Sequence, residues 1–201
     1  VLELEDAAAG KFTFTIWPDN PGYKLIESYV LKASALVFKR EDMIIWQGQI
    51  TDFKEIFDKA LQVECEGDLA LLDTTIQRPA EYHTITVAQY LGYLLTAHNQ
   101  TCGAGKEFYI GSVTVSDPTD TIYRYTNWES TLAVIQTDLL DKFGGHLRIR
   151  YADGKRYLDY LKDCPRLSEQ DIVFGENLMD YSKSHDASDI ATVCIPLGAK
   201  L

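Results

Sequence analysis

The stretch from residue 122 to residue 161 constrains the fold most, because it places a strand, a capped helix, a helix stop and a hairpin in close succession. Thr126 and Glu129 have the spacing of a capping box, in which each side chain bonds a free backbone N–H of the first helical turn. Apolar residues then recur at helical spacing over 128–143, which is typical of one buried helix face. The sequence therefore predicts a helix that begins near Thr126.

The residues after this helix predict a β-hairpin. Gly144 or Gly145 can take the left-handed conformation that ends a helix. Apolar and arginine residues alternate over 147–151, as in a half-buried strand. The pair Asp153-Gly154 favours a type I′ turn, which needs positive φ angles, and the return strand follows over 157–161.

The first 78 residues favour β-structure. Strands are expected over 11–16, 36–39, 43–49 and 61–66, with turn formers between them. Gly48, close to Trp46, indicates a bulge or a close approach of two backbones. Asp68 is expected to cap a short helix over 69–72. This spacing of strands and turns is typical of a β-barrel or a β-sandwich, and we expect a β-barrel-like domain over residues 1–78.

Composition changes after Gln77-Arg78-Pro79 and indicates a separate α+β domain over residues 79–163. Thr86 and Gln89 form a second capping box before a helix whose apolar face includes His98. We interpret His98, near the end of this helix, as a complement to the helix dipole. Residues 164–201 are expected to start a second β domain or to return strands to the first, so the fold class is α+β.

The net charge of −11 excludes several kinds of partner. Thirty acidic residues outnumber 19 basic ones. Binding to a nucleic-acid backbone or to an anionic membrane needs clustered cations. No apolar run approaches the roughly 18 residues of a membrane-spanning helix. We therefore expect neither specific nucleic-acid binding nor membrane insertion.

The cysteines and histidines have no spacing typical of a metal site, and no Cys-x-x-Cys pair occurs. They are Cys65, Cys102, Cys164 and Cys194, with His83, His98, His146 and His185. Buried free thiols are the favoured interpretation of the cysteines, and a disulfide framework or a zinc site is the alternative.

The loop Gly103-Ala104-Gly105-Lys106 only superficially resembles a phosphate-binding loop. Gln100 stands where the motif needs glycine, and Glu107 stands where it needs serine or threonine. A plain turn is therefore favoured. No catalytic, cofactor-binding or metal-binding residue is predicted. The 12 tyrosines favour strand packing and protein interfaces, and a carbohydrate-binding platform is the alternative.

A series of turn, cap and strand-end motifs runs through most of the chain. They are Leu36-Val37-Phe38, Ile45-Trp46-Gln47-Gly48-Gln49-Ile50, Val63-Glu64-Cys65-Glu66-Gly67-Asp68-Leu69-Ala70-Leu71-Leu72, Trp128-Glu129-Ser130-Thr131-Leu132, Phe143-Gly144-Gly145-His146-Leu147, Gly175-Glu176-Asn177-Leu178 and Thr192-Val193-Cys194-Ile195-Pro196-Leu197-Gly198. In this order they resemble the N-terminal region of tail baseplate hub proteins of Gram-positive phages and prophages. This family is also described as prophage tail endopeptidases, tail-associated lysins or phage minor structural proteins.

The resemblance implies a structural protein of the virion tail tip, assembled in the cytoplasm of the bacterial host. Family members form homotrimers in which two β-barrel-like domains per subunit build a pseudo-sixfold ring, with an α+β insertion between them. The ring connects the tail tube and distal tail proteins to host-binding or lytic modules. Those modules lie downstream, so the resemblance implies no enzymatic activity for this segment. The alternatives are a peptidoglycan endopeptidase and a carbohydrate-binding module of the tail tip.

Two further expectations follow from this interpretation. The second barrel would lie almost wholly after Leu201, which predicts an unpaired sheet edge and self-association by strand addition. The acidic balance fits a ring through which DNA passes without sticking, because like charges repel.

Overall fold

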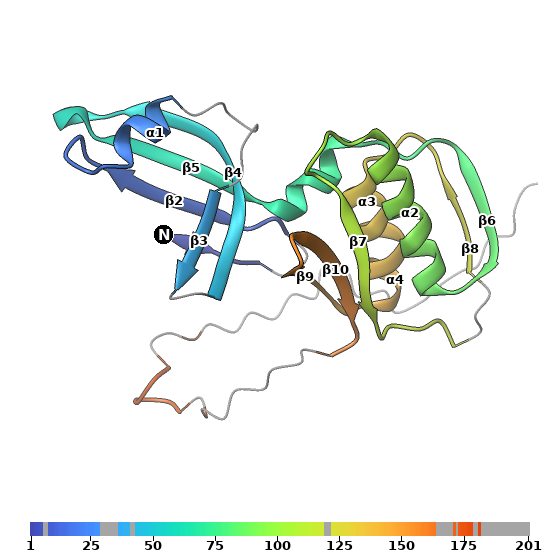
Figure 1. Ribbon diagram of the computed structural model, residues 1–201. Coiled ribbons are helices and arrows are strands. Elements are labelled where there is room, and N and C mark those ends of the chain that lie inside the picture. Colours follow the sequence, from blue (N-terminus) through green and yellow to red (C-terminus); the bar gives the residue numbers. More distant parts are fainter. Residues whose placement is uncertain are drawn as a thin grey trace, which may run out of the picture. The chain divides into compact units, whose positions relative to one another are not determined.

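The computed structural model describes residues 1–5, 8–28, 36–40, 43–118, 122–163, 171, 173–178 and 181. The chain divides into two compact units, Val1–Pro165 and Arg166–Leu201, and each is considered by itself. The first unit combines helices with three sheets (Figure 1), which confirms the α+β class. The boundary that we predict near residue 78 falls inside this unit and stays a prediction.

The first sheet is a curled half-barrel of five strands (Figure 1). Its strands are β1 (Leu2–Glu3), β2 (Lys11–Ile16), β3 (Leu36–Arg40), β4 (Met43–Glu55) and β5 (Leu61–Gly67). They pair antiparallel in the order β1-β2-β5-β4-β3. The short helix α1 (Tyr23–Glu27) follows β2, and the turn η1 (Phe57–Lys59) joins β4 to β5. The strands expected over 11–16, 36–39, 43–49 and 61–66 are all confirmed.

Alternation along β5 explains the core of this sheet. Leu61, Val63 and Cys65 are buried, whereas the residues between them are partly exposed. Trp46 packs on the same core. A Cβ atom at Gly48 would lie 2.1 Å from the Glu66 carbonyl oxygen and 2.5 Å from the Trp46 ring, so only glycine fits. The predicted close approach at Gly48 is confirmed.

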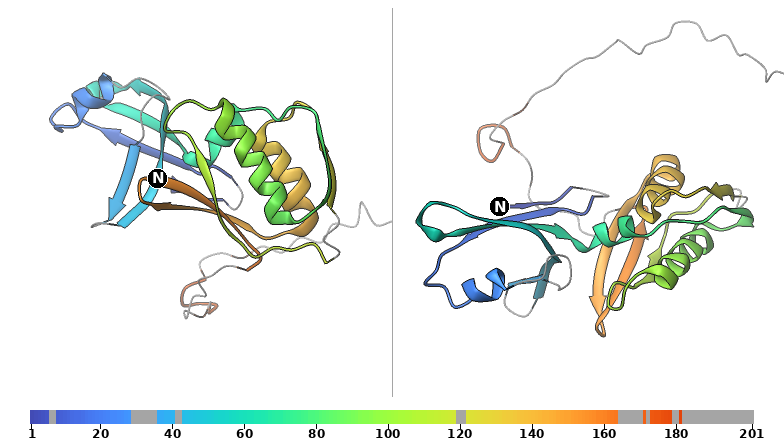
Figure 2. Two further views of the ribbon diagram at one scale, coloured as in Figure 1. Left: turned by 45° about the vertical axis from the view of Figure 1, so that its right-hand side comes forward. Right: turned by 90° about the horizontal axis from the view of Figure 1, so that it is seen from above.

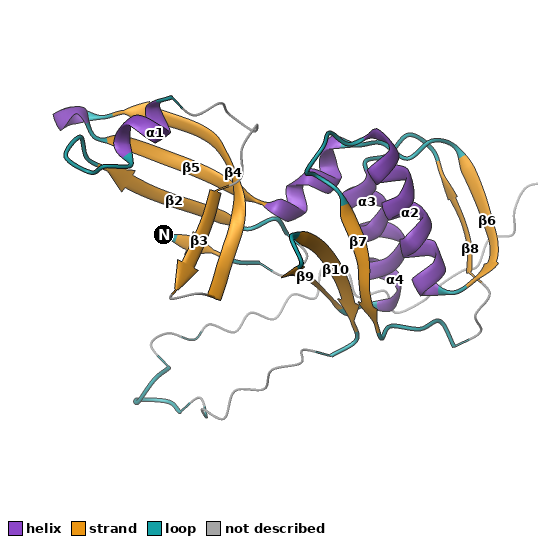
Figure 3. Ribbon diagram, in the orientation of Figure 1, coloured by secondary structure: helices purple, strands orange, loops and turns teal. Residues whose placement is uncertain are grey.

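The rest of the first unit is a helical layer with two small sheets. Its elements are η2 (Asp68–Thr74), β6 (Ala80–Ile85), α2 (Val87–Thr101), β7 (Phe108–Val113), β8 (Ile122–Thr126), α3 (Thr131–Ile135), η3 (Gln136–Leu140), α4 (Asp141–Phe143), β9 (His146–Ala152) and β10 (Lys155–Leu161). One sheet has the order β7-β10-β9, with β7 parallel to β10, and the other pairs β6 with β8. Helices α2 and α3 lie between these sheets (Figures 2 and 3).

The core of this layer forms where the helices pack on the three-stranded sheet. Leu91 and Leu94 of α2, Ile135 of α3 and Leu158 and Tyr160 of β10 are fully buried together. The predicted start of α2 is confirmed, because the side chains and backbone N–H groups of its capping box bond reciprocally at 2.9 and 3.1 Å.

The predicted start of the next helix is wrong. Helix α3 begins at Thr131, and its cap is Ser130, whose hydroxyl accepts the Ala133 N–H at 3.2 Å. Thr126 instead ends β8, which pairs with β6, so strand pairing overrides the local capping pattern. Trp128 has a φ of +70°, which no helical residue adopts, and its side chain is exposed.

The predicted helix stop and hairpin are confirmed. Gly144 and Gly145 have φ angles of +66° and +90° directly after α4. Asp153 and Gly154 have φ angles of +51° and +70°, as a type I′ turn requires. In the second unit, the Asn177 side-chain oxygen accepts a hydrogen bond from the Val173 N–H at 2.7 Å. Phe174 and Leu178 form an isolated β-bridge. Most of residues 164–201, where we expect a second β domain to start or strands to return to the first, lies outside the described residues.

Candidate functional site

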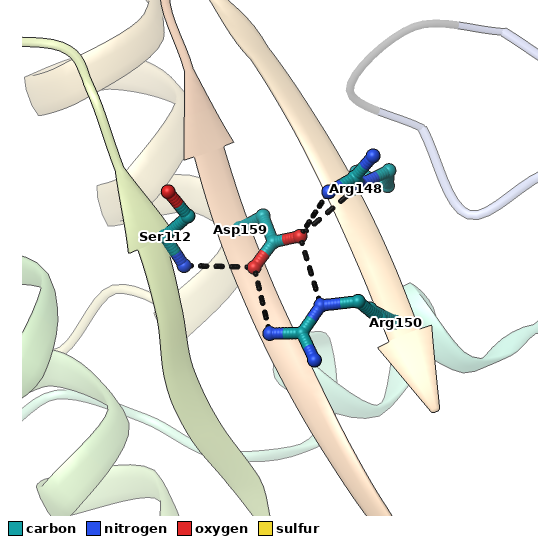
Figure 4. Close-up of polar contacts among 4 residues, drawn as sticks. All are labelled: Ser112, Arg148, Arg150 and Asp159. Carbon is teal, nitrogen blue, oxygen red and sulfur yellow. Dashed lines mark hydrogen bonds and ion pairs between the residues drawn. The ribbon is translucent and has the colours of Figure 1, made fainter. Parts of the chain in front are cut away.

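The outer face of the sheet β7-β10-β9 gathers arginine and tyrosine side chains around a buried carboxylate. Figure 4 shows this carboxylate, Asp159, with Arg148, Arg150 and Ser112 around it. Leu158 and Tyr160 of β10 point into the helical core, so the alternation of the strand puts Asp159 on the opposite face. The residues of this face, which we call the Arg–Tyr face, are Tyr109, Arg148, Arg150, Lys155, Tyr157 and Asp159.

Asp159 is the centre of the Arg–Tyr face and has no exposed surface. One carboxylate oxygen accepts the Ser112 N–H at 2.8 Å (Figure 4). The other accepts from Arg148 at 2.6 and 3.1 Å, whereas the Arg150 contacts are longer, at 3.4 and 3.5 Å. Burial alone would raise the pKa of Asp159, but the hydrogen bonds from Arg148, Ser112 and Arg150 lower it below its usual value.

A glycine makes room for this carboxylate. A Cβ atom at Gly111 of β7 would lie 2.0 Å from a carboxylate oxygen of Asp159. The hydrogen bond between Asp159 and Ser112, which adds to the backbone pairing of β7 with β10, therefore depends on a glycine at this position.

Cations and aromatic rings alternate across the same face. The Arg150 guanidinium lies 4.9 Å from the centre of the Tyr157 ring, and the Lys155 ammonium lies 4.8 Å from that of Tyr109. The two tyrosine rings are 5.9 Å apart. Arg148 and Arg150 keep 45% and 46% of their side chains exposed, so Asp159 orients both guanidinium groups without hiding them. Oriented arginines beside tyrosines are typical of protein interfaces.

A second exposed surface lies at the end of the half-barrel where β4 turns into β5. Phe57 of the turn η1 is 92% exposed, and its neighbour Ile56 and Trp17, which follows β2, are exposed as well. The Tyr23 hydroxyl donates to the Lys59 carbonyl oxygen at 2.7 Å and holds α1 against this turn. We call Trp17, Ile56 and Phe57 the apolar tip.

A second buried carboxylate, Asp68, does not cap its helix as predicted, because Gly67 takes the cap position of η2 without a side-chain bond. One oxygen of Asp68 instead accepts from Gln47 at 3.0 Å, from the Tyr151 hydroxyl at 3.1 Å and from Arg156. Burial and the Asp68 carboxylate raise the pKa of Tyr151, so its hydroxyl stays protonated and donates.

His98 is part of a buried hydrogen-bond chain and not a charged complement to the helix dipole. Its Nε2 lies 3.0 Å from the Lys106 carbonyl oxygen and must donate to it, so Nδ1 accepts from the Thr75 hydroxyl at 2.6 Å. Thr131 and Gln77 extend the chain at 2.9 and 2.7 Å. Burial lowers the pKa of His98, which keeps the ring neutral, so the dipole interpretation is wrong.

The other residues singled out in the sequence are dispersed. Cys65 is buried in the half-barrel and Cys102 follows α2, both as free thiols, and burial raises the pKa of Cys65 to about 11. Cys164, Cys194 and His185 lie outside the described residues. Exposed His83 contacts Glu81 at 3.3 Å. Gly105 lies in a turn, as expected, and its carbonyl oxygen accepts from Arg156 at 2.6 Å.

The described part of the chain holds no group of three or more His, Cys, Asp and Glu side chains arranged to hold a metal ion. Among the same residues, no helix is long and apolar enough to cross a membrane. No model of a known protein family matches the chain, and no curated protein matches it.

Proposed function

We propose that this chain is the N-terminal hub segment of a phage or prophage tail tip protein. In this role it forms, with two further copies, a ring between the tail tube and distal tail proteins on one side and host-binding or lytic modules on the other. It acts at the virion tail tip after assembly in the host cytoplasm, as a structural part without enzymatic activity of its own.

One observation carries the proposal. A curled antiparallel half-barrel is followed directly by an α+β segment, which is the order of parts that the resemblance implies. The half-barrel ends at β5, and η2 begins at the next residue, so the two parts are joined without a long linker. This continuity suits a ring subunit, in which the insertion has to keep a fixed position on its barrel.

The two exposed surfaces support assembly. Trp17, Ile56 and Phe57 are exposed together at one end of the half-barrel, and clustered exposed apolar side chains often mark protein interfaces. The Arg–Tyr face offers oriented guanidinium groups, and the chain itself is strongly acidic, so a second copy presents suitable carboxylates. The same negative charge suits a channel for DNA.

The test is the mass in solution, measured by light scattering coupled to size exclusion over a wide concentration range. We expect a species of three times 22.7 kDa. Electron microscopy class averages of that species should have threefold symmetry. Phe57→Ser and Arg150→Glu should weaken the trimer, and Lys162→Glu, exposed just after β10, serves as a control.

A monomer at every concentration would contradict the proposal that these residues hold the ring contacts. Release of soluble fragments from purified cell walls by this chain would instead support the endopeptidase alternative and contradict a purely structural role.

A further inference from the structure

A hollow of about 280 Å³ lies within the first unit, beside the buried carboxylate of Asp68. Trp46 and Gln47 of β4 line it, together with Ile149 and Tyr151 of β9. The hydrogen bonds from Gln47 and Tyr151 to Asp68 fix this wall. The hollow is thus formed by side chains that other contacts already hold in place.

Within the part of the chain that the structure describes, two buried polar atoms at this hollow lack a hydrogen-bond partner. They are the indole N–H of Trp46 and the second carboxylate oxygen of Asp68, Oδ1. Trp46 is 5% exposed and Asp68 is 1% exposed, so bulk water does not satisfy them. A buried polar group left unpaired costs about 1–3 kcal/mol, and folded proteins pair nearly all such groups with protein, water or ligand. One donor, the Trp46 indole N–H, and one acceptor, Asp68 Oδ1, are therefore available at this hollow to a water molecule or a ligand.

The charges around Asp68 limit what this partner can be. Arg156 already neutralises the carboxylate through Oδ2. A metal cation would meet the Arg156 charge and cannot accept the indole N–H. An anion would meet the lone pairs of Asp68 Oδ1. A hydroxyl group both accepts and donates, so it satisfies either atom.

The size and the lining of the hollow indicate an occupant larger than a single water molecule. Its volume is roughly nine times the ~30 Å³ that a water molecule occupies in the liquid. Leu69, Leu147 and Ile149 give it an apolar side, next to the polar side formed by Gln47 and Asp68. A sugar ring or a polyol matches this lining, because its C–H groups suit the apolar side and its hydroxyl groups suit the polar side. A neighbouring hollow of about 320 Å³ shares Gln47 and Tyr151 with it.

We propose that this hollow binds a small neutral polyhydroxyl ligand, a monosaccharide or polyol. Its hydroxyl groups accept the Trp46 indole N–H and donate to Asp68 Oδ1, and its C–H groups pack on the apolar side. The hollow borders the Arg–Tyr face, because Arg148 lines it as well, and none of its lining residues belongs to the apolar tip. The proposal does not depend on the hub function.

The spectrum of the three tryptophan indole N–H groups tests this proposal directly. In ¹H–¹⁵N NMR of the unaltered chain, methyl glucoside, methyl galactoside and myo-inositol are titrated in turn. We expect the Trp46 indole resonance to move saturably with at least one of them. Trp17 and Trp128 are exposed and serve as internal controls that should not move in the same way. Inorganic phosphate and calcium chloride should leave the Trp46 resonance in place.

A matched pair of variants completes the test. Asp68→Asn should weaken the binding tenfold or more, whereas Asp73→Asn, an exposed carboxylate on the same helical segment, should leave it unchanged. The proposal is overturned if none of the three compounds moves the Trp46 resonance saturably, which would leave ordered water as the occupant. Equal movement of all three indole resonances would also overturn it, because it would indicate a general solvent effect.

Discussion

Replacing Asp159 by asparagine tests whether the Arg–Tyr face depends on its buried carboxylate. The substitution Asp159→Asn keeps the shape of the side chain and removes its charge. The amide oxygen can still accept the Ser112 N–H, which lies 2.8 Å from the present carboxylate oxygen. The amide NH₂ then faces the donors of Arg148, so donors oppose donors where two hydrogen bonds stood.

The size of the effect follows from the geometry. Hydrogen bonds to charged groups contribute about 1.5–3 kcal/mol each. The Arg148 bonds at 2.6 and 3.1 Å are good, whereas the Arg150 contacts at 3.4 and 3.5 Å lie at the limit and contribute little. Because Arg148 is almost half exposed, it can turn toward water when it loses its partner. We therefore expect a loss of about 2–3 kcal/mol in the free energy of unfolding, below the ~3–5 kcal/mol of a fully buried pair.

Urea unfolding followed by circular dichroism at several pH values measures this loss. The pKa of Asp159 is lowered in the folded chain, so its contribution is complete above the unfolded pKa near 3.8. It is lost as the pH falls through the folded pKa, and the difference between wild type and Asp159→Asn should shrink there. Asp163→Asn, an exposed carboxylate just after β10, is the control. A variant as stable as wild type at pH 7, or an unchanged difference in acid, would refute the reasoning.

Three further predictions concern single residues. Burial lowers the pKa of His98, so just below pH 6.5 only the unfolded chain binds this proton. The free energy of unfolding should therefore decrease as the pH falls below 6.5, by up to ~1.4 kcal/mol per pH unit from this residue. Urea titrations of His98→Gln should lack this dependence on pH, and its retention would contradict the assignment. Gly145→Ala should lower the free energy of unfolding in urea by about 2–4 kcal/mol, because φ is +90° and the new Cβ lies 2.7 Å from a β10 carbonyl oxygen. Gly154→Ala, which has no atom within 4 Å of the new Cβ, should lower it by only about 1 kcal/mol. Equal losses would count against the close contact at Gly145. Cys65, with a pKa of about 11, should react with iodoacetamide at pH 7 far more slowly than Cys102, as followed by mass spectrometry, and equal rates would be inconsistent with its burial.

Local signals predicted the elements whose contacts are close in sequence. The hairpin of β9 and β10 and the capping box of α2 depend on residues within a few positions of each other, and both are confirmed. The start of α3 was missed because β8 pairs with β6, more than 40 residues earlier, and this pairing keeps Thr126 in a strand. A capping pattern is therefore a weak guide where a strand ends just before a helix.

The centre of the Arg–Tyr face was missed although the sequence contains its signal. The turn at Asp153-Gly154 fixes the register of the hairpin, and that register pairs Asp159 with Arg148. An acid opposite one of two alternating arginines predicts a cross-strand ion pair. The contact of Ser112 with Asp159 had no such signal, because β7 joins β10 in parallel from 47 residues away. Asp68 likewise meets Tyr151 and Arg156 across more than 80 residues.

The placement of the arginines bears on how so acidic a chain can assemble. Three of its 19 cations, Arg148, Arg150 and Arg156, bind the two buried carboxylates Asp159 and Asp68. These five groups together carry a positive charge, so the remaining surface is more acidic than the net charge of −11 indicates. In the ring that we propose, the net negative charge opposes contact between copies, and the Arg–Tyr face offers cations to the carboxylates of a neighbouring copy. For that proposed ring, such a charge arrangement would favour association in one orientation over random aggregation.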